Sequence, residues 1–193
     1  MSNTLLESVV KKNRARLIPF MLALYVLAFL DRSNIGFAKE TYQLDTGLSN
    51  EAYALGAGIF FVVYAFLGVP ANLLMRKFGA RKWIGCTTLL WGLLSAAMAW
   101  ADTEAKFLLV RTLLGAAEAG FFPGMIYLTS QWFPQQNRAS IMGLFYMGAP
   151  LALTLGSPLS GALLEMHGFM GHPGWFWMFI IEGLLAVGAG FFT

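Results

Sequence analysis

The sequence predicts an all-α membrane protein with six transmembrane helices. Of its 193 residues, 58% are apolar and only 12% are charged, whereas about a quarter of the residues in a soluble domain carry charge. Six separate stretches also reach the length of about 20 mostly apolar residues that a helix needs to cross the hydrocarbon core of a bilayer. The intervening segments are short, as loops between neighbouring membrane helices are.

The first three helices are predicted at residues 17–38, 52–75 and 83–101. The first holds the apolar run LIPFMLALYVLAFL, the second GAGIFFVVYAFLGVP, and the third TTLLWGLLSAAMAW. The loops after the first two contain KETYQLDTGLSNE and RKFGARK, which are rich in charge and turn-forming residues.

The last three helices are predicted at residues 106–130, 139–166 and 175–193, separated by QWFPQQNR and HGFMGHPG. Gly and Pro recur inside these spans, as in GAAEAGFFPG and GSPLSG. Lipid tolerates both residues, because small residues allow close helix contacts and neighbouring groups can satisfy a broken turn. The chain ends inside the sixth span, which predicts that a further half is missing.

Lysine and arginine near the helix ends predict the orientation. Basic residues cluster before the first helix and in the second loop, whereas the first and third loops each carry one. Because basic loops stay in the cytoplasm, we expect a cytoplasmic N-terminus, with residues 1–16 as a basic segment and residues 17–193 as the helical bundle. The polar start shows no cleavable signal peptide.

The same composition excludes several function classes. The net charge of +3 comes from two short clusters and forms no basic face, so nucleic acid is not an expected partner. The sequence lacks the G-x-S-x-G, H-E-x-x-H and G-x-x-x-x-G-K-[ST] motifs, so neither an enzyme nor ATP-driven transport is indicated. His167 and His172 have a poor spacing for a shared metal, and we expect no metal or cofactor.

Ionisable residues inside the predicted helices are the strongest functional signal. Charge at membrane depth costs a few kcal/mol and marks a bundle interior or a watery cavity. At a rise of 1.5 Å per residue, Asp31 and Glu118 lie about 21 Å and about 18 Å from the expected cytoplasmic ends of their helices. They therefore share a depth. Arg111, Gly115 and Glu118 follow i, i+4, i+7, which predicts one face with Gly115 opening space between the charges.

Two interpretations of these charges remain open. In the structural one, Asp31 pairs with Arg32 or Arg111, Glu118 pairs with Arg111, and the set only joins helices. Adjacent helical residues point about 100° apart, however, so Asp31 and Arg32 cannot serve one contact. In the functional one, the acids take up and release protons while a guanidinium binds a carboxylate substrate. Glu165 and Glu182 are interpreted as structural.

The motifs LDRSNIGFA, GVPANLLMRKFGARKWIG, GAAEAGFFPGMIYLTSQWFP and WMFIIEG together resemble the anion:cation symporter family of the major facilitator superfamily, over essentially the whole chain. The resemblance implies the N-terminal half of a twelve-helix fold whose halves rock around a central site. It also implies a bacterial inner-membrane carrier that imports a sugar acid together with protons.

The resemblance assigns roles to individual residues. Asp31 and Glu118 would bind protons, and Arg111 would modulate the protonation of Glu118. Arg32 and Tyr64 would bind the substrate, whose hydroxyl groups would also meet Asn34. The cytoplasmic loop motif of the superfamily maps onto four residues: Arg76, Lys77, Gly79 and Arg81.

The sequence departs from the superfamily pattern in two places. Arg76 and Lys77 stand where the loop motif has an acidic residue before its basic pair. The fifth helix has GSPLSG in place of the antiporter glycine-proline pattern, which favours symport. The rival interpretation is a half-transporter that does not transport and acts at most as an assembly partner in the membrane. A channel is disfavoured, because opposite charges at one depth differ from a uniform selectivity ring.

Overall fold

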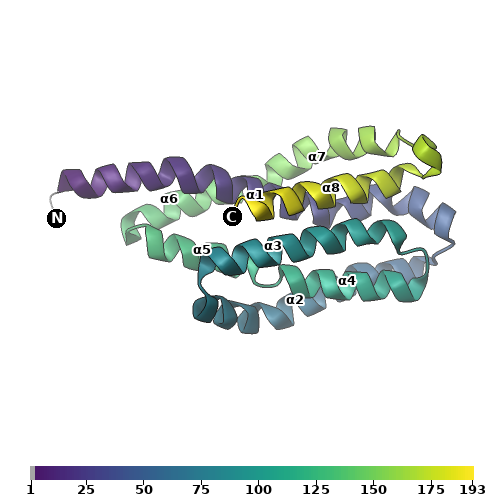
Figure 1. Cartoon of the computed structure of the whole chain (residues 1–193), viewed down its shortest axis with the longest axis horizontal. Helices are drawn as coiled ribbons and strands as arrows, with labels where there is room; N and C mark the ends of the chain where they lie inside the picture. Colours follow the sequence, from purple (N-terminus) through teal and green to yellow (C-terminus); the bar gives the residue numbers. More distant parts are fainter. Residues whose placement is uncertain (1–2) are drawn as a thin grey trace.

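The computed structural model describes residues 3–193, with side chains from residue 7 onward. Within this range the chain folds into helices joined by short turns, and six units are long and apolar enough to cross a membrane. Figure 1 shows them as one elongated bundle, from which the start of the first helix projects. The predicted all-α class and the number of spans are confirmed.

The helices follow one another in the order α1 (Asn3–Thr46), α2 (Asn50–Phe78), α3 (Ala80–Ala97), η1 (Met98–Trp100), α4 (Glu104–Glu118), α5 (Phe121–Trp132), α6 (Gln135–Tyr146), α7 (Gly148–Leu164), η2 (Phe169–Gly171) and α8 (Gly174–Phe191). The membrane-crossing units are α1, α2, α3 with η1, α4 with α5, α6 with α7, and α8.

Helix α1 is much longer than the predicted span of residues 17–38. It contains 44 residues and is therefore about 66 Å long, about twice the thickness of a hydrocarbon core. Hydropathy marks only the part of a helix that lipid would surround, so the polar turns at both ends were missed. The predicted basic segment at residues 1–16 is helical from Asn3 onward, and residues 1–2 lie outside the described range. Its cytoplasmic location stays a prediction.

The spans predicted at residues 106–130 and 139–166 are confirmed as membrane-crossing units, and each of them consists of two helices. The fourth span breaks between Glu118 and Phe121, and the fifth breaks at Met147. Each break precedes a proline, Pro123 or Pro150, whose ring removes the hydrogen bond to the carbonyl four residues earlier and crowds it. The polar side chain of Glu118 consequently lies at a helix end in the middle of the bundle.

Local sequence signals fix several helix ends. The hydroxyl of Ser49 accepts a hydrogen bond from the backbone N–H of Ala52 at the start of α2, and Thr103 does the same for Lys106 in α4, as N-cap residues do. Gly79, the only residue between α2 and α3, has φ of 88° and ψ of 141°. Side chains disfavour this conformation, so glycine is required at this tight connection.

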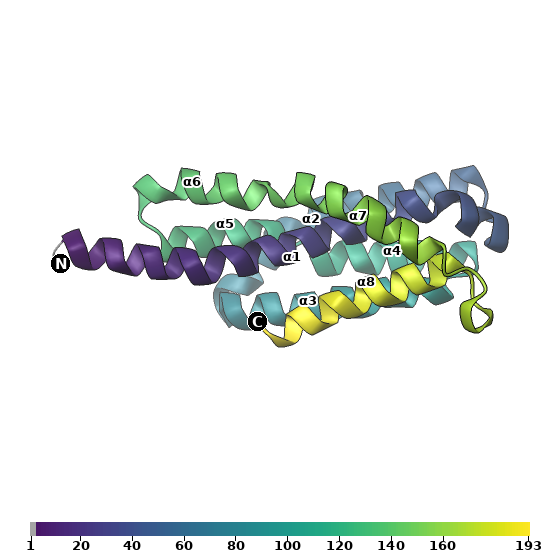
Figure 2. The ribbon, with the colours of Figure 1, turned by 90° about the horizontal axis from the view of Figure 1, so that it is seen from above.

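The bundle is held together by close backbone approaches between helix pairs. Helix α3 packs on α8, α2 on α4, and α1 on α7, and Figure 2 shows α1 passing alongside α7. A Cβ atom added to Gly92 of α3 would lie 2.8 Å from the carbonyl oxygen of Gly183 in α8. A Cβ atom added to Gly115 of α4 would lie 2.5 Å from the carbonyl oxygen of Phe60 in α2. The expectation that Gly115 leaves open space between Arg111 and Glu118 is therefore wrong, because the backbone of α2 fills that space.

Buried aromatic side chains close the end of the bundle where α1 meets α2. The hydroxyl of Tyr42 donates a hydrogen bond to the carbonyl oxygen of Ala101, and Tyr53 donates to that of Ile35. The indole Nε1 of Trp175 donates to Asp45 Oδ2 at 2.7 Å. These bonds tie α1, α2, α8 and the connection after α3 together at this end of the bundle.

Candidate functional site

A buried ion pair joins the middle of α1 to the end of α4. Arg32 Nε donates to Glu118 Oε2 at 2.8 Å, with the side chain of Arg32 16% exposed and that of Glu118 0% exposed. The sequence placed residues 31 and 118 at one depth, and the structure brings Arg32 and Glu118 into contact there. It does not form the pairs that the structural interpretation considered for Glu118 and Arg111, since the ion pairs among residues 7–193 are this one and a surface pair.

Aromatic rings from α2 support both arginines. The guanidinium carbon of Arg32 lies 4.6 Å from the centre of the Tyr64 ring, and that of Arg111 lies 4.5 Å from the centre of the Phe60 ring. Ring faces attract cations most strongly where water is excluded. The aromatic rings therefore help to hold two guanidinium groups in an apolar bundle.

Arg111 is anchored without an acid in direct contact. It is 2% exposed, and its Nε donates to the carbonyl oxygen of Gly56 at 3.2 Å. Arg111 lies seven residues before Glu118 on α4, about two helical turns away.

Asp31 points away from Arg32, as adjacent positions on a helix require. The Ser95 hydroxyl of α3 donates to Asp31 Oδ1, and the amide Nδ2 of Asn34 lies 3.5 Å from the same oxygen. Asp31 is 4% exposed and Asn34 is 1% exposed. The two neighbouring charges thus serve different contacts: Arg32 faces α2 and α4, and Asp31 faces α3.

Sequence reasoning missed three members of this polar core. Ser95 and Ser160 gave no signal, because serine is common at helix contacts. Glu182 was interpreted as structural together with Glu165. Glu165 is exposed at the end of α7, whereas Glu182 is 4% exposed and accepts a hydrogen bond from Ser160 Oγ at 2.9 Å. The signal that could have identified Glu182 as part of the polar core is its position as the single acid in the apolar run FIIEGLL.

Polar atoms in the core remain available for a ligand. Among residues 7–193, Arg32 Nη2, Glu118 Oε1 and Asp31 Oδ2 are buried without a hydrogen-bond partner in the protein. Buried polar atoms are nearly always paired, so an unpaired set at one depth indicates a place where another molecule or a proton binds. A carboxylate can pair with Arg32 Nη2, and a protonated acid can donate through its own oxygen.

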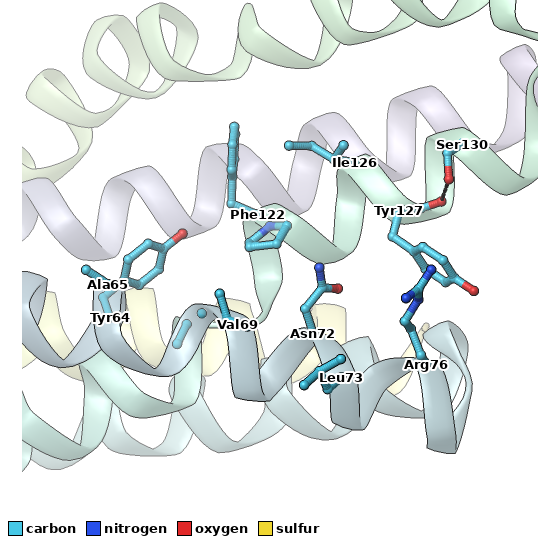
Figure 3. A pocket seen from close by; sticks show the side chains of 13 residues that line it. Tyr64, Ala65, Val69, Asn72, Leu73, Arg76, Phe122, Ile126, Tyr127 and Ser130 are labelled. Carbon is cyan, nitrogen blue, oxygen red and sulfur yellow. Dashed lines mark hydrogen bonds between the residues drawn. The ribbon is translucent and has the colours of Figure 1, made fainter.

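A groove runs along α2 and α5 and begins at Tyr64, the residue whose ring lies against Arg32. It has a volume of about 630 Å³ and runs from Tyr64 past Asn72 to Arg76, with Phe122 and Tyr127 on its other side. Figure 3 shows the Tyr64 ring at one end of the groove and Arg76 beside Tyr127 at the other. The groove therefore connects the ring that supports Arg32 with the end of the bundle that carries the basic loop.

The residues of the loop motif occupy that end of the bundle. Arg76 and Lys77 form the last turn of α2, and the guanidinium carbon of Arg76 lies 5.3 Å from the centre of the Tyr127 ring. Gly79 makes the turn into α3, where Arg81 Nε donates to the carbonyl oxygen of Thr193 at 2.9 Å. Arg76 thus faces the groove, while Arg81 ties α3 to the end of α8.

Comparison with known proteins identifies the family. Residues 21–193 match the family described as the Major Facilitator Superfamily. The chain belongs to this superfamily. It is 92% identical over its full length to the inner membrane transport protein RhmT of Escherichia coli K12, of which it spans 45%. It is 50% identical over 96% of its length to an Agrobacterium vitis protein whose name provisionally assigns it tartrate transport, and spans 41% of that protein.

The superfamily fold is seen directly in a solved structure. The chain superposes on a bacterial homologue of the human lysosomal transporter Spinster, in an inward-facing and occupied conformation, with a TM-score of 0.86 and 20% identity. The match covers 93% of this chain and 43% of the homologue. The chain therefore has the fold of the N-terminal six-helix half of a superfamily transporter, and it is a multi-pass membrane protein.

Proposed function

We propose that this chain is the N-terminal half of a secondary active transporter that imports a sugar acid, L-rhamnonate, by proton symport. The proposal places it in the bacterial inner membrane with its N-terminus in the cytoplasm. The observation that carries it is the ion pair between Arg32 and Glu118, in which one guanidinium nitrogen stays unpaired and the guanidinium lies against Tyr64, the residue at which the groove begins. A carboxylate substrate and a proton can both compete for that pair.

Proton binding and substrate binding favour each other in this arrangement. When Glu118 takes up a proton it loses its charge, so the pair with Arg32 weakens and the guanidinium becomes free for a carboxylate. A guanidinium holds a carboxylate through two parallel hydrogen bonds, which a lone ammonium cannot do. When Glu118 releases its proton it recaptures Arg32 and the substrate leaves.

The neighbouring residues receive supporting roles. Tyr64 lies against Arg32 and at the head of the groove, where its ring and hydroxyl are placed to meet a polyhydroxy acid. Asp31 is the second proton-binding acid, and Arg111 acts on both acids through space. The amide Nδ2 of Asn34 lies 3.5 Å from Asp31 Oδ1. A contact between Asn34 and a substrate hydroxyl therefore requires this side chain to rearrange when the transporter closes around the substrate.

The relatives support an anionic substrate without defining it. RhmT is named an inner membrane transport protein, and the Agrobacterium vitis relative is named for tartrate, a carboxylic acid. The second candidate function is a non-transporting half that assembles with a partner in the membrane. The chain spans less than half the length of either relative.

Uptake into membrane vesicles tests both candidates. Vesicles containing the 193-residue chain are assayed for labelled L-rhamnonate with and without an inward proton gradient, beside vesicles in which six further helices complete the chain. We expect gradient-dependent uptake in the completed protein. If uptake by the completed protein is the same with and without the proton gradient, the proposed symport is overturned. If the completed protein takes up no L-rhamnonate, the proposed substrate is overturned. Uptake only after completion would favour the second candidate for the chain alone.

A further inference from the structure

A second polar site lies between α8, α7 and α1, apart from the pair of Arg32 and Glu118. Its centre is Glu182 in the middle of α8, which is 4% exposed. Ser160 Oγ of α7 donates to Glu182 Oε1 at 2.9 Å, and Glu182 Oε2 is buried with no partner among the described side chains. The carboxyl group is therefore only half satisfied by the protein.

Glu182 also lacks a cationic partner within the described part of the chain, whose ion pairs involve other residues. Burying a charge without a counter-charge is far more costly than burying a neutral hydrogen-bonded group. Glu118 differs in this respect, since Arg32 compensates its charge. The surroundings of Glu182 are consequently those of a carboxyl group that carries a proton.

Asn34 and Asp31 are buried on α1, which packs against α8. The side-chain amide of Asn34 lies 3.5 Å from Asp31 Oδ1. Asp31 is the buried ionisable group of α1, Ser160 is the polar group from α7, and α3 contributes the close backbone contact of Gly92 with Gly183.

We propose that Glu182 is a third proton-binding site, linked through Asn34 to Asp31, so that the two acids are not ionised at the same time. The site is built from Glu182, Ser160, Asn34 and Asp31, and its ligand is a proton. That Glu182 holds a proton depends on the structure alone. Its part in coupling, in which Asp31 loses its proton while Glu182 keeps one, depends on the symport function proposed above.

Infrared spectroscopy of the full chain in lipid tests the site without any substrate. A protonated carboxyl group gives a C=O stretching band that the carboxylate lacks. We expect the band at neutral pH to be weaker in Glu182→Gln than in the unchanged chain, because glutamine keeps the size but holds no acidic proton. Glu165→Gln is the matched control, since Glu165 is exposed, and it should leave the buried band intact. Equal bands in the unchanged chain and Glu182→Gln at every pH would overturn the proposal.

Two further variants test the hydrogen bond and the link. Ser160→Ala removes the donor to Glu182, so the band should shift in frequency, and this readout remains if Glu182→Gln does not fold. Asp31→Asn removes the neighbouring negative charge, so the Glu182 band should disappear at a lower pH than in the unchanged chain. If the band keeps its frequency in Ser160→Ala, the proposed proton site at Glu182 is contradicted. If the pH at which the Glu182 band disappears is unchanged in Asp31→Asn, the proposed link between Glu182 and Asp31 is contradicted.

Transport measurements distinguish proton binding at Glu182 from a role of that proton in coupled uptake. In the completed transporter, Glu182→Gln should shift the pH profile of gradient-driven uptake, while Glu165→Gln should not. If the infrared band is present but uptake is independent of protons, the site stands and the proposed symport fails. If uptake is proton-driven and Glu182→Gln leaves its pH profile unchanged, the role of Glu182 in coupling is overturned.

Discussion

Arg32 Nε and Glu118 Oε2 are 2.8 Å apart, although 86 positions separate the two residues in the chain. The pair joins α1 to the point where the fourth span breaks. A guanidinium held by one carboxylate oxygen, with another nitrogen unpaired, can exchange that partner for a substrate.

Glu118→Gln should abolish accumulation of L-rhamnonate driven by a proton gradient in the completed transporter. Glutamine keeps the shape of the side chain but cannot carry a charge, so Arg32 is never recaptured. Exchange of labelled for unlabelled substrate should persist, because exchange needs no net proton movement. The measurement is uptake into vesicles with and without the gradient, and undiminished accumulation would contradict the role of Glu118.

Arg32→Lys should weaken substrate binding about ten- to hundredfold. Lysine keeps the positive charge but loses the planar fork, and a hydrogen bond to a charged group contributes about 1.5–3 kcal/mol. The affinity for L-rhamnonate, measured by calorimetry or by substrate protection, tests this. An unchanged dissociation constant would mean that the carboxylate binds elsewhere.

Tyr64→Phe and Tyr64→Leu should separate the ring from the hydroxyl. The ring centre is 4.6 Å from the Arg32 guanidinium carbon, and such a contact contributes about 0.5–2 kcal/mol. Tyr64→Leu should therefore bind substrate less tightly than Tyr64→Phe. If the two variants bind alike and both bind weakly, the hydroxyl is the important group; if both bind as the unchanged protein, Tyr64 lies outside the site.

Gly115→Ala should destabilise the bundle by about 1–3 kcal/mol through overpacking. The added Cβ would lie 2.5 Å from the Phe60 carbonyl oxygen, where the α2 backbone cannot move without disturbing the neighbouring turn. Gly58→Ala is the matched control, because nothing lies within 4 Å of its Cβ position. Thermal unfolding in detergent should show a lower midpoint for Gly115→Ala alone, and equal midpoints would refute the close crossing.

Lys106→Gln should raise the pKa of Asp102 toward its usual value. Lys106 Nζ lies 2.5 Å from Asp102 Oδ1 on the surface, and this hydrogen bond lowers the pKa of Asp102. A lowered pKa means that the pair stabilises the fold at pH above the unfolded pKa, and that this stabilisation is lost as the pH falls through the folded value. Because both side chains are exposed, thermal stability at neutral pH should barely change. A carboxyl titration by NMR measures the pKa, and an unmoved value would exclude the pair in solution.

The six spans could be predicted from the sequence because the cost of placing polar groups in lipid applies to each segment by itself. The same cost identified Asp31, Arg32, Arg111 and Glu118 as candidates, since charge inside an apolar run is visible without any partner. Their common depth followed from the helical rise alone. Helix ends were less predictable, as α1 shows, because hydropathy reports the lipid-facing part of a helix and not where its hydrogen bonding stops.

Only the tertiary structure decided which charge meets which. On sequence grounds Arg111 was the candidate partner of Glu118, whereas the structure pairs Glu118 with Arg32. This contact depends on how α1 and α4 are rotated about their axes. That rotation is set by backbone contacts such as Gly115 with Phe60, and the break before Pro123 places Glu118 at a helix end. Ser160 and Glu182 likewise meet only because α7 and α8 pack side by side. The sequence determined which groups lie in the membrane, and the packing of distant helices determined their partners, because an ion pair depends on ångström distances that no local pattern specifies.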